Sequence, residues 1–215
     1  MINRFRESKN YQILNEILSA MTHGFGVAFS IAGLVLIIIR GVQVGGAMRI
    51  TTFSIYGAIL VIFYLASTLF HSLYFTKAEK VFQIFDHSAI YLLIAGTYVP
   101  YCLVTIGGVL GWLTLIIIWA MALAGIIYKS LYGNRYPIGS TIIYIVMGWM
   151  CLIDIWPLWH TLSHFSFWLL VMGGVAFTLG AVIYSFKRIL FGHVIWHLFV
   201  MLGTALMYFS IYLSV

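Results

Sequence analysis

Histidines at helical spacing are the residues of this chain with the clearest potential for chemistry. His193 and His197 are four residues apart, so on a helix their imidazoles lie on one face, one turn apart. This geometry lets two imidazoles bind one metal ion, as in the HExxH zinc motif. The residues between them are Val194, Ile195 and Trp196, so the glutamate that acts as general base in that motif is absent.

A third histidine and two further polar residues could complete such a site. His71 would give a set of three imidazoles, and catalytic zinc sites typically use three protein ligands and keep a fourth position for water. Ser67 precedes His71 by four residues and shares its helix face, so its hydroxyl could hold a bound water or orient a ligand. Asp86 could act on that water as a base or a hydrogen-bond partner.

Each of these residues also has a plain structural interpretation. A lone pair of histidines is more often a hydrogen-bonding contact between helices than a metal site. Ser67 is a small polar residue suited to a helix contact, and Asp86 could pair with Lys80 or cap a helix. His87 points about 100° away from Asp86 on a helix, which favours a structural hydrogen bond for it.

The composition places all these residues in a chain built for a bilayer. The sequence has 215 residues, of which 63% are hydrophobic and 7% charged, and its mean hydropathy is +1.07. Soluble domains carry about 25% charged residues. An ionisable side chain such as Asp at the centre of a membrane helix costs about 2.5–3.5 kcal/mol on insertion scales, so such residues persist where they pair, bind a metal or line a pathway.

Apolar runs of about 20 residues, long enough to cross a bilayer, occur seven times. They lie near residues 22–40, 51–75, 86–106, 109–128, 138–156, 166–186 and 193–213. Pro137 and Pro157 bracket the fifth run, and Pro100 should kink or end the third. No small-residue cleavage site follows a short apolar core, so no cleaved signal peptide is expected. The sequence therefore predicts an all-α bundle of seven transmembrane helices in a single domain, residues 1–215, with residues 1–20 as a polar cytosolic arm.

Basic residues alternate between the two sides of the predicted bundle. Arg40 and Arg49 lie on one side, and the other nine of the eleven lie on the side of the N-terminus: Arg4, Arg6, Lys9, Lys77, Lys80, Lys129, Arg135, Lys187 and Arg188. The positive-inside rule puts that side, with the N-terminus, in the cytosol and the C-terminus outside. The same loop residues account for the net charge of +6, so no nucleic-acid partner is expected.

Polar residues of four spans share one depth near the predicted cytosolic face. They are Glu16, Ser19 and His23 of the first span, His71 of the second, Asp86, His87 and Ser88 of the third, and His193 and His197 of the seventh. Random placement would scatter them over both faces, so this convergence favours a metal site over separate helix contacts. An ion pair between Glu16 and His23 is an alternative for those two residues.

Four other residues of metal-binding type are expected to lie outside this site. His160 and His164 fall in the outer fifth loop and should be solvated. Cys102 and Cys151 are too few for a disulfide framework or a four-thiolate site, and two separate lipid-buried thiols are favoured over a disulfide.

Several motifs together identify a family resemblance. They are Glu16, Ser19 and His23, Ser67-x-x-x-His71, Asp86-His87-Ser88, Ala95-Gly96-Thr97 with Pro100, and His193-x-x-x-His197. In this combination the chain, from Glu16 to its end, resembles the bacterial hemolysin III family. That family belongs with the progestin and adipoQ receptors and, more distantly, with the alkaline ceramidases.

The resemblance implies a seven-helix protein of the bacterial plasma membrane with one zinc ion per chain near the cytosolic side. By similarity, the metal ligands are His71, His193 and His197. Asp86 and Ser67 would contact the zinc-bound water. Such a site is linked to hydrolysis of lipid amide bonds in the receptor relatives and ceramidases, and bacterial members to haemolysis and membrane homeostasis. The chain departs from the family at Val194, where an acidic residue is common, which leaves Asp86 as the main candidate proton carrier.

Different functions fit these observations. The leading hypothesis is a zinc-dependent hydrolase of a lipid amide or ester, with membrane lipids as environment and substrate. The alternatives are a non-enzymatic membrane-state sensor with structural zinc, and a haemolytic pore. A pore is less favoured because Asp154 is the only polar intramembrane residue noted near the outer end. A bis-histidine haem site would need histidine pairs on facing helices. The substrate, the oligomeric state and the choice of zinc over another divalent metal stay open, since imidazole suits several metals.

Overall fold

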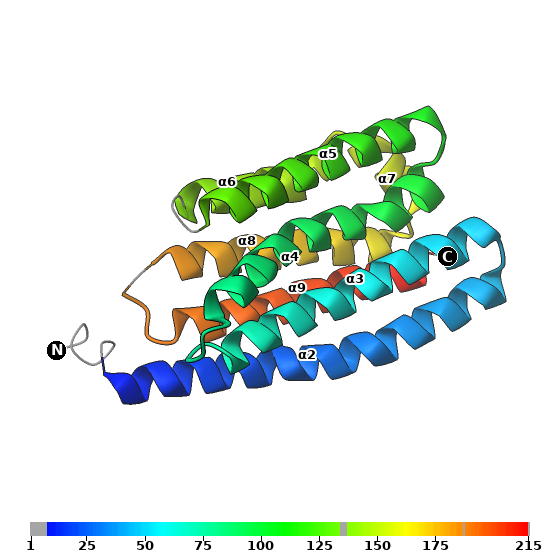
Figure 1. The fold of residues 1–215 in the computed structure, drawn as a ribbon. Helices are drawn as coiled ribbons and strands as arrows, with labels where there is room; N and C mark the ends of the chain where they lie inside the picture. The colour runs from blue at the N-terminus through cyan, green and yellow to red at the C-terminus, as the bar shows by residue number, and fades with distance from the viewer. Residues whose placement is uncertain (1–7, 134–136, 187, 215) are drawn as a thin grey trace.

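Helices make up the structure, a computed structural model that describes residues 8–133, 137–186 and 188–214. The long helices are α2 (Lys9–Val44), α3 (Ala47–Ser72), α4 (Glu79–Pro100), α5 (Gly108–Tyr132), α6 (Pro137–Trp149), α8 (His164–Ser185) and α9 (Gly192–Leu213). Three short elements join them: the π-helix η1 (Tyr101–Ile106), the 3-10 turn η2 (Met150–Leu152) and α7 (Ile155–Thr161). The helices run side by side along one bundle axis, and the described residues contain no strand (Figure 1).

Six of these helices are long and apolar enough to cross a membrane. A seventh crossing results if α6 with η2 and α7 count as one span, bent by 57°. Large apolar side chains such as Phe29, Val109 and Ile116 are exposed on the outside of the bundle, where lipid would cover them. The predicted all-α membrane bundle is therefore confirmed, and seven spans result when the bent pair is one of them.

The first helix begins earlier than the hydropathy pattern indicates. Ser8 caps α2 by accepting a hydrogen bond from the Tyr11 backbone N–H at 3.3 Å, and the helix continues without interruption from Lys9. Tyr11, Glu16 and Ser19 are buried on one face of it. The described part of the predicted polar arm is thus the first turns of a long helix, because Tyr11 and Glu16 have hydrogen-bond partners on other helices or loops of the bundle.

Two helices are interrupted at the end of the bundle where α7 lies. Pro100 ends α4 as predicted, and in η1 the Gly107 N–H donates to the Cys102 carbonyl, five residues back, at 2.9 Å. The fifth span was predicted as one run over 138–156, but regular α-helix stops at Trp149, and α7 leaves at an angle. We call this the aspartate end, because Asp154 lies at the break, and the opposite end, where His71 lies, the histidine end.

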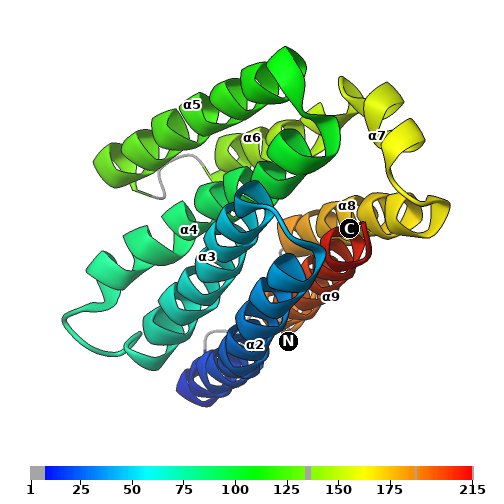
Figure 2. The same cartoon turned by 90° about the vertical axis from the view of Figure 1, so that its right-hand side faces the viewer.

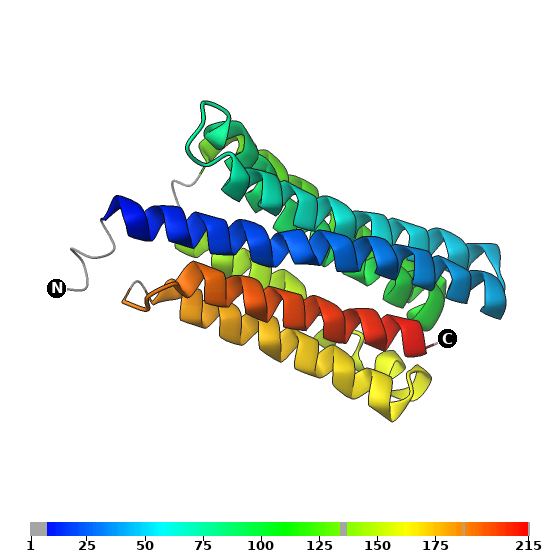
Figure 3. The ribbon, with the colours of Figure 1, turned by 90° about the horizontal axis from the view of Figure 1, so that it is seen from below.

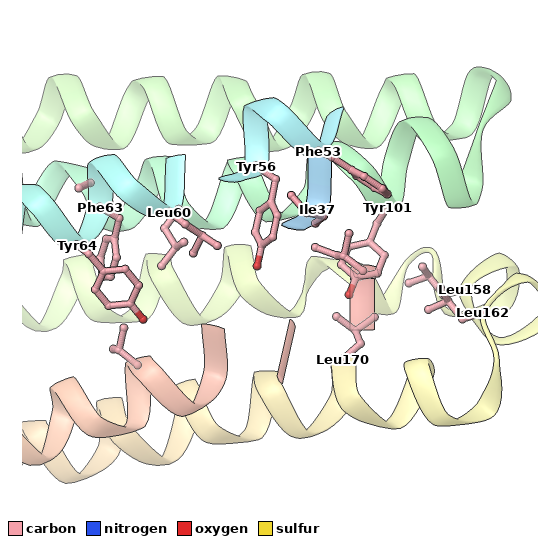
Figure 4. Packing of buried hydrophobic residues seen from close by; sticks show 14 of the residues in the cluster. Ile37, Phe53, Tyr56, Leu60, Phe63, Tyr64, Tyr101, Leu158, Leu162 and Leu170 are labelled. Carbon is pink, nitrogen blue, oxygen red and sulfur yellow. The ribbon is translucent and has the colours of Figure 1, made fainter. Parts of the chain in front are cut away.

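Helix α2 packs against both α3 and α9, and α8 packs against α9 (Figures 2 and 3). Gly26 permits the close approach of α2 to α3, since a Cβ there would overlap the Tyr64 ring. A buried apolar cluster fills the space between α3, α9 and the α7–α8 corner, with Phe63 and Tyr64 toward the histidine end and Tyr101 toward the aspartate end (Figure 4). This packing brings segments that are far apart in the sequence to one depth.

Candidate metal centre

Three imidazoles converge at the histidine end of the bundle. The Nε2 atom of His193 lies 3.1 Å from Nε2 of His71 and 3.1 Å from Nε2 of His197. The candidate ligand atoms of all three residues lie within 4.8 Å of one another. Tetrahedral zinc with Zn–N bonds of 2.0–2.1 Å separates its ligand nitrogens by about 3.3 Å. The predicted convergence of these histidines is confirmed, and the cluster can hold a metal ion.

The helix ends explain why these side chains meet. His71 lies in the last turn of α3, and His193 and His197 occupy the first turns of α9. Both helices pack against the N-terminal half of α2, which carries residues 16–23 between them (Figure 3). Hydrogen bonds from the outer ring nitrogens hold the orientation: His71 Nδ1 lies 2.7 Å from Glu16 Oε2, and His197 Nδ1 lies 3.2 Å from the Ser19 carbonyl oxygen.

The partners of Nδ1 determine which ring nitrogens can bind a metal. A carbonyl oxygen and a carboxylate accept hydrogen bonds, so Nδ1 of His197 and of His71 carries the proton and donates it. Their Nε2 atoms then present lone pairs toward Nε2 of His193. A single N–H on His193 cannot donate a good hydrogen bond to both of these lone pairs, whereas one cation can bind all three Nε2 atoms. A carboxylate often supports a metal-binding histidine by accepting a hydrogen bond from its other ring nitrogen, and Glu16 accepts such a bond from His71.

His23 lies beside the three imidazoles without joining them. Its ring stacks on His197 with 3.6 Å between centroids, and it is 1% exposed. Neither ring nitrogen has a hydrogen-bond partner among the described residues. The suggested ion pair of Glu16 with His23 is wrong, because the Glu16 carboxylate pairs with His71 instead. His23 therefore acts as packing that holds the ring plane of His197.

A cavity of about 150 Å³ adjoins the histidines. His193 and His197 line it together with Ser67 and Asp86, while most of its remaining wall is apolar. Ser67 is 1% exposed, and its hydroxyl has no hydrogen-bond partner among the described residues. The structure thus places both predicted catalytic side chains on the same cavity as two of the three predicted ligands.

The structure excludes the helix-capping role suggested for Asp86 and confirms the structural hydrogen bond expected for His87. Because α4 begins at Glu79, Asp86 lies two turns inside the helix and does not cap it, and no ion pair with Lys80 is found in the described ranges. His87 Nδ1 lies 2.7 Å from the Gln83 carbonyl oxygen, which is the structural hydrogen bond that was expected. His87 also contributes to the cavity wall.

Lys129 is a site residue that the sequence reasoning missed, since it was assigned to a loop. It belongs to the last turn of α5, is 2% exposed and lines the same cavity as Asp86. A signal was available: Ile118, Ala122, Gly125 and Lys129 follow at steps of three or four residues, and all four are buried on one face of α5.

The residues predicted to lie outside the site do so. His160 and His164 are exposed near α7, where His160 contacts the Trp156 ring and His164 stacks on Trp159. Cys102 and Cys151 are free cysteines, so the interpretation as separate thiols is confirmed.

The fold and the site define a helical membrane protein with an internal three-histidine cluster at one end of its bundle. The chain belongs to the haemolysin-III-related family, whose profile matches residues 11–208. Similar proteins place it among multi-pass proteins of the cell membrane. It is 44% identical to Hemolysin-3 of Bacillus cereus over 199 residues, 93% of this chain and 91% of that protein.

Two further relatives extend the comparison. The Hemolysin-3 homolog of Bacillus subtilis (strain 168) is 44% identical over 201 residues, 94% of either chain. The human monocyte to macrophage differentiation factor is 30% identical over 164 residues, 74% of this chain and 68% of that protein. No solved structure matches the chain.

Proposed function

We propose that this protein is a zinc-dependent hydrolase that cleaves an amide or ester bond of a membrane lipid. The observation that carries the proposal is the shared cavity. Two of the three clustered histidines, a buried carboxyl group and a buried hydroxyl line one largely apolar space inside a membrane bundle. A catalytic site for lipids needs these parts together: a metal position, a proton acceptor and room for an acyl chain.

The donor set fits zinc. Three imidazole Nε2 atoms, one of them backed by the Glu16 carboxylate, form the usual ligand number of a catalytic zinc site. His71, His193 and His197 would hold the ion. When bound, zinc activates a water molecule and polarises a carbonyl group.

The remaining roles belong to the chain's own side chains. The Asp86 carboxylate accepts the proton of the attacking water and returns it to the leaving nitrogen or oxygen. The Ser67 hydroxyl, which has no partner in the described structure, donates a hydrogen bond that orients the water. Apolar residues such as Phe63, Leu93 and Val200 contact the acyl chain and exclude bulk water.

Metal content and lipid turnover test this proposal together. Purified wild-type protein should contain about one zinc per chain, and His71→Ala should lose it. Asp86→Asn should keep the metal and lose hydrolysis of fluorescent ceramide or phospholipid in lipid nanodiscs. Retained turnover in Asp86→Asn would exclude the role given to this carboxylate. Zinc without turnover on any lipid would favour a sensor with structural zinc.

A further inference from the structure

Asp154 is a carboxyl group buried at the aspartate end of the bundle, opposite the histidines. It is 0% exposed, and neither carboxyl oxygen has a hydrogen bond of ordinary geometry within the described ranges. The hydroxyl of Thr114 on α5 lies close enough to stabilise it. An ionised carboxylate is costly in such surroundings, by several kcal/mol even after relaxation, so the side chain needs a proton or a bound water.

The local backbone turns this side chain inward. Asp154 occupies the N-cap position of α7, where an Asp side chain normally accepts a hydrogen bond from the second or third backbone N–H of the helix. No such bond is made, and the third helical residue is Pro157, which has no N–H. The carboxyl group lines a small cavity instead.

This small cavity has a volume of about 30 Å³, enough for a water molecule. Its wall includes Tyr101, Leu158 and Leu170, which Figure 4 shows at the aspartate end of the apolar cluster. Both helix interruptions, η1 and the break before α7, contribute residues to it. Irregular backbone at membrane depth is tolerated where it is buried in protein or lines a water-filled space, and discontinuous helices often form ion sites.

No permanent charge lies against Asp154 in the described structure. Its titratable neighbours carry hydroxyls or thiols: they are Tyr98, Tyr101, Cys102 and Cys151. The other helices packed around it contribute the apolar side chains of Leu170 on α8 and Met207 on α9. Protonation of this carboxyl group is therefore neither opposed by a nearby fixed cation nor favoured by a nearby fixed anion.

The small cavity and the large cavity at the histidines are neighbours. Thr97, Tyr98, Gly148 and Met207 line both of them. A single layer of side chains thus divides the two spaces, and it contains two hydroxyls, a glycine and a flexible methionine. Ionisable side chains lie beyond it on both sides, with Asp154 at one end and Asp86 at the other.

We propose that this protein conducts protons across the membrane through the two cavities, and that Asp154 is the proton-binding group at the aspartate end. The carboxylate takes up one proton from that side and releases it to water in the small cavity. Water that crosses the layer of Thr97 and Met207 passes the proton into the large cavity and out at the histidine end. One proton enters for each that leaves, and the membrane potential or pH gradient drives it. The proposal does not depend on hydrolase activity.

Proton flux into vesicles tests the proposal. The purified protein is reconstituted into liposomes that enclose a pH-sensitive dye, and a potassium diffusion potential is imposed with valinomycin. Wild-type protein should acidify the interior faster than protein-free liposomes, without any requirement for a sodium gradient. Asp154→Asn should reduce the flux to the protein-free level, and Asp154→Glu should retain part of it. Glu79→Gln, at a carboxyl group that lines neither cavity, is the matched control and should leave the flux unchanged.

Two further measurements keep the test decisive if Asp154→Asn folds poorly. Thr97→Val removes a hydroxyl that, among the described residues, donates to the Leu93 carbonyl of its own helix, so the variant should fold normally and lower the flux. Infrared difference spectra of wild-type protein should show a protonated carboxyl band that changes with external pH and is absent from Asp154→Asn. Flux equal to that of protein-free liposomes, undiminished flux in folded Asp154→Asn, or a flux that needs sodium would overturn the proposal.

Discussion

Replacing Glu16 with glutamine should weaken the proposed zinc binding without removing any of the three histidines. The Glu16 carboxylate accepts a hydrogen bond from His71 Nδ1 at 2.7 Å, and the two side chains are only 11% and 2% exposed. A charge-assisted bond in such surroundings is stronger than a neutral one. Gln retains an oxygen acceptor but loses the charge, and its NH₂ group can instead donate to Nδ1. In that orientation the proton of His71 moves to Nε2 and blocks the ligand atom.

The expected magnitude follows from the behaviour of such supporting carboxylates. Their loss costs about 10–100-fold in metal affinity, which corresponds to about 1.4–2.7 kcal/mol. The assay is a competition titration: metal-free protein in detergent micelles shares zinc with a chromogenic chelator of known affinity. Thermal unfolding of the metal-free variant checks that the fold is intact.

Glu79→Gln provides the control for this experiment. Glu79 begins α4 and is not part of the three-histidine cluster, so its neutralisation removes one negative charge and leaves the hydrogen bond of Glu16 with His71 in place. Wild-type affinity in Glu16→Gln would refute the assignment of this carboxylate as the support of His71. An equal loss in Glu79→Gln would show that net charge, and not the hydrogen bond, governs binding.

Two other predictions concern the cluster and the helix packing. His197→Ala should lose zinc in mass spectrometry of the purified protein, whereas His164→Ala, in an exposed residue near α7, should keep it; retention in both would exclude the cluster as the metal site. Gly26→Ala should lower the free energy of unfolding by about 1–3 kcal/mol, because its Cβ would overlap the Tyr64 ring. Gly24→Ala, on the same helix with its nearest contact at 3.9 Å, should leave the melting temperature unchanged or higher.

The proposed hydrolase and the proposed proton route share the large cavity, but the residues that distinguish them lie at opposite ends of the molecule. The three-histidine cluster lies where α3 ends and α9 begins, and Asp154 lies where the fifth span breaks. Variants at one end can therefore be assayed for the activity of the other. Zinc content in Asp154→Asn should equal that of the wild type, which distinguishes a local effect on proton flux from general misfolding.

Hydropathy and spacing were sufficient to predict the class of fold and the core of the site. Apolar runs identify the spans because a bilayer requires about 20 apolar residues for each crossing. The i,i+4 spacing of His193 and His197 and the position of His71 at the end of its span fixed their depth. Because these histidines lie near the ends of their helices, their shared depth was nearly sufficient to predict that the three imidazoles meet.

Hydropathy could not detect features that depend on partners from other helices. The polar start of α2 has the hydropathy of an exposed arm, yet Glu16 is buried because its carboxylate accepts a hydrogen bond from His71 of α3. By its charge, Lys129 is interpreted as a loop residue that sets the orientation in the membrane. It lies instead on the buried face of α5, where it lines the large cavity. Hydropathy averaged along one segment measures the polarity of that segment alone. It carries no information on the side chains of other helices that pair with its polar residues.

The sequence by itself determined that this chain is a helical membrane protein, where most spans begin and end, and which histidines share one depth. Only the tertiary structure decided the rotation of each helix about its axis and the identity of its neighbours. These set the pairing of Glu16 with His71, the common cavity of Ser67 and Asp86, and the burial of Asp154 at a broken span. The reason is physical: depth is set by transfer of single segments into lipid, whereas rotation and adjacency are set by side-chain packing among all of them.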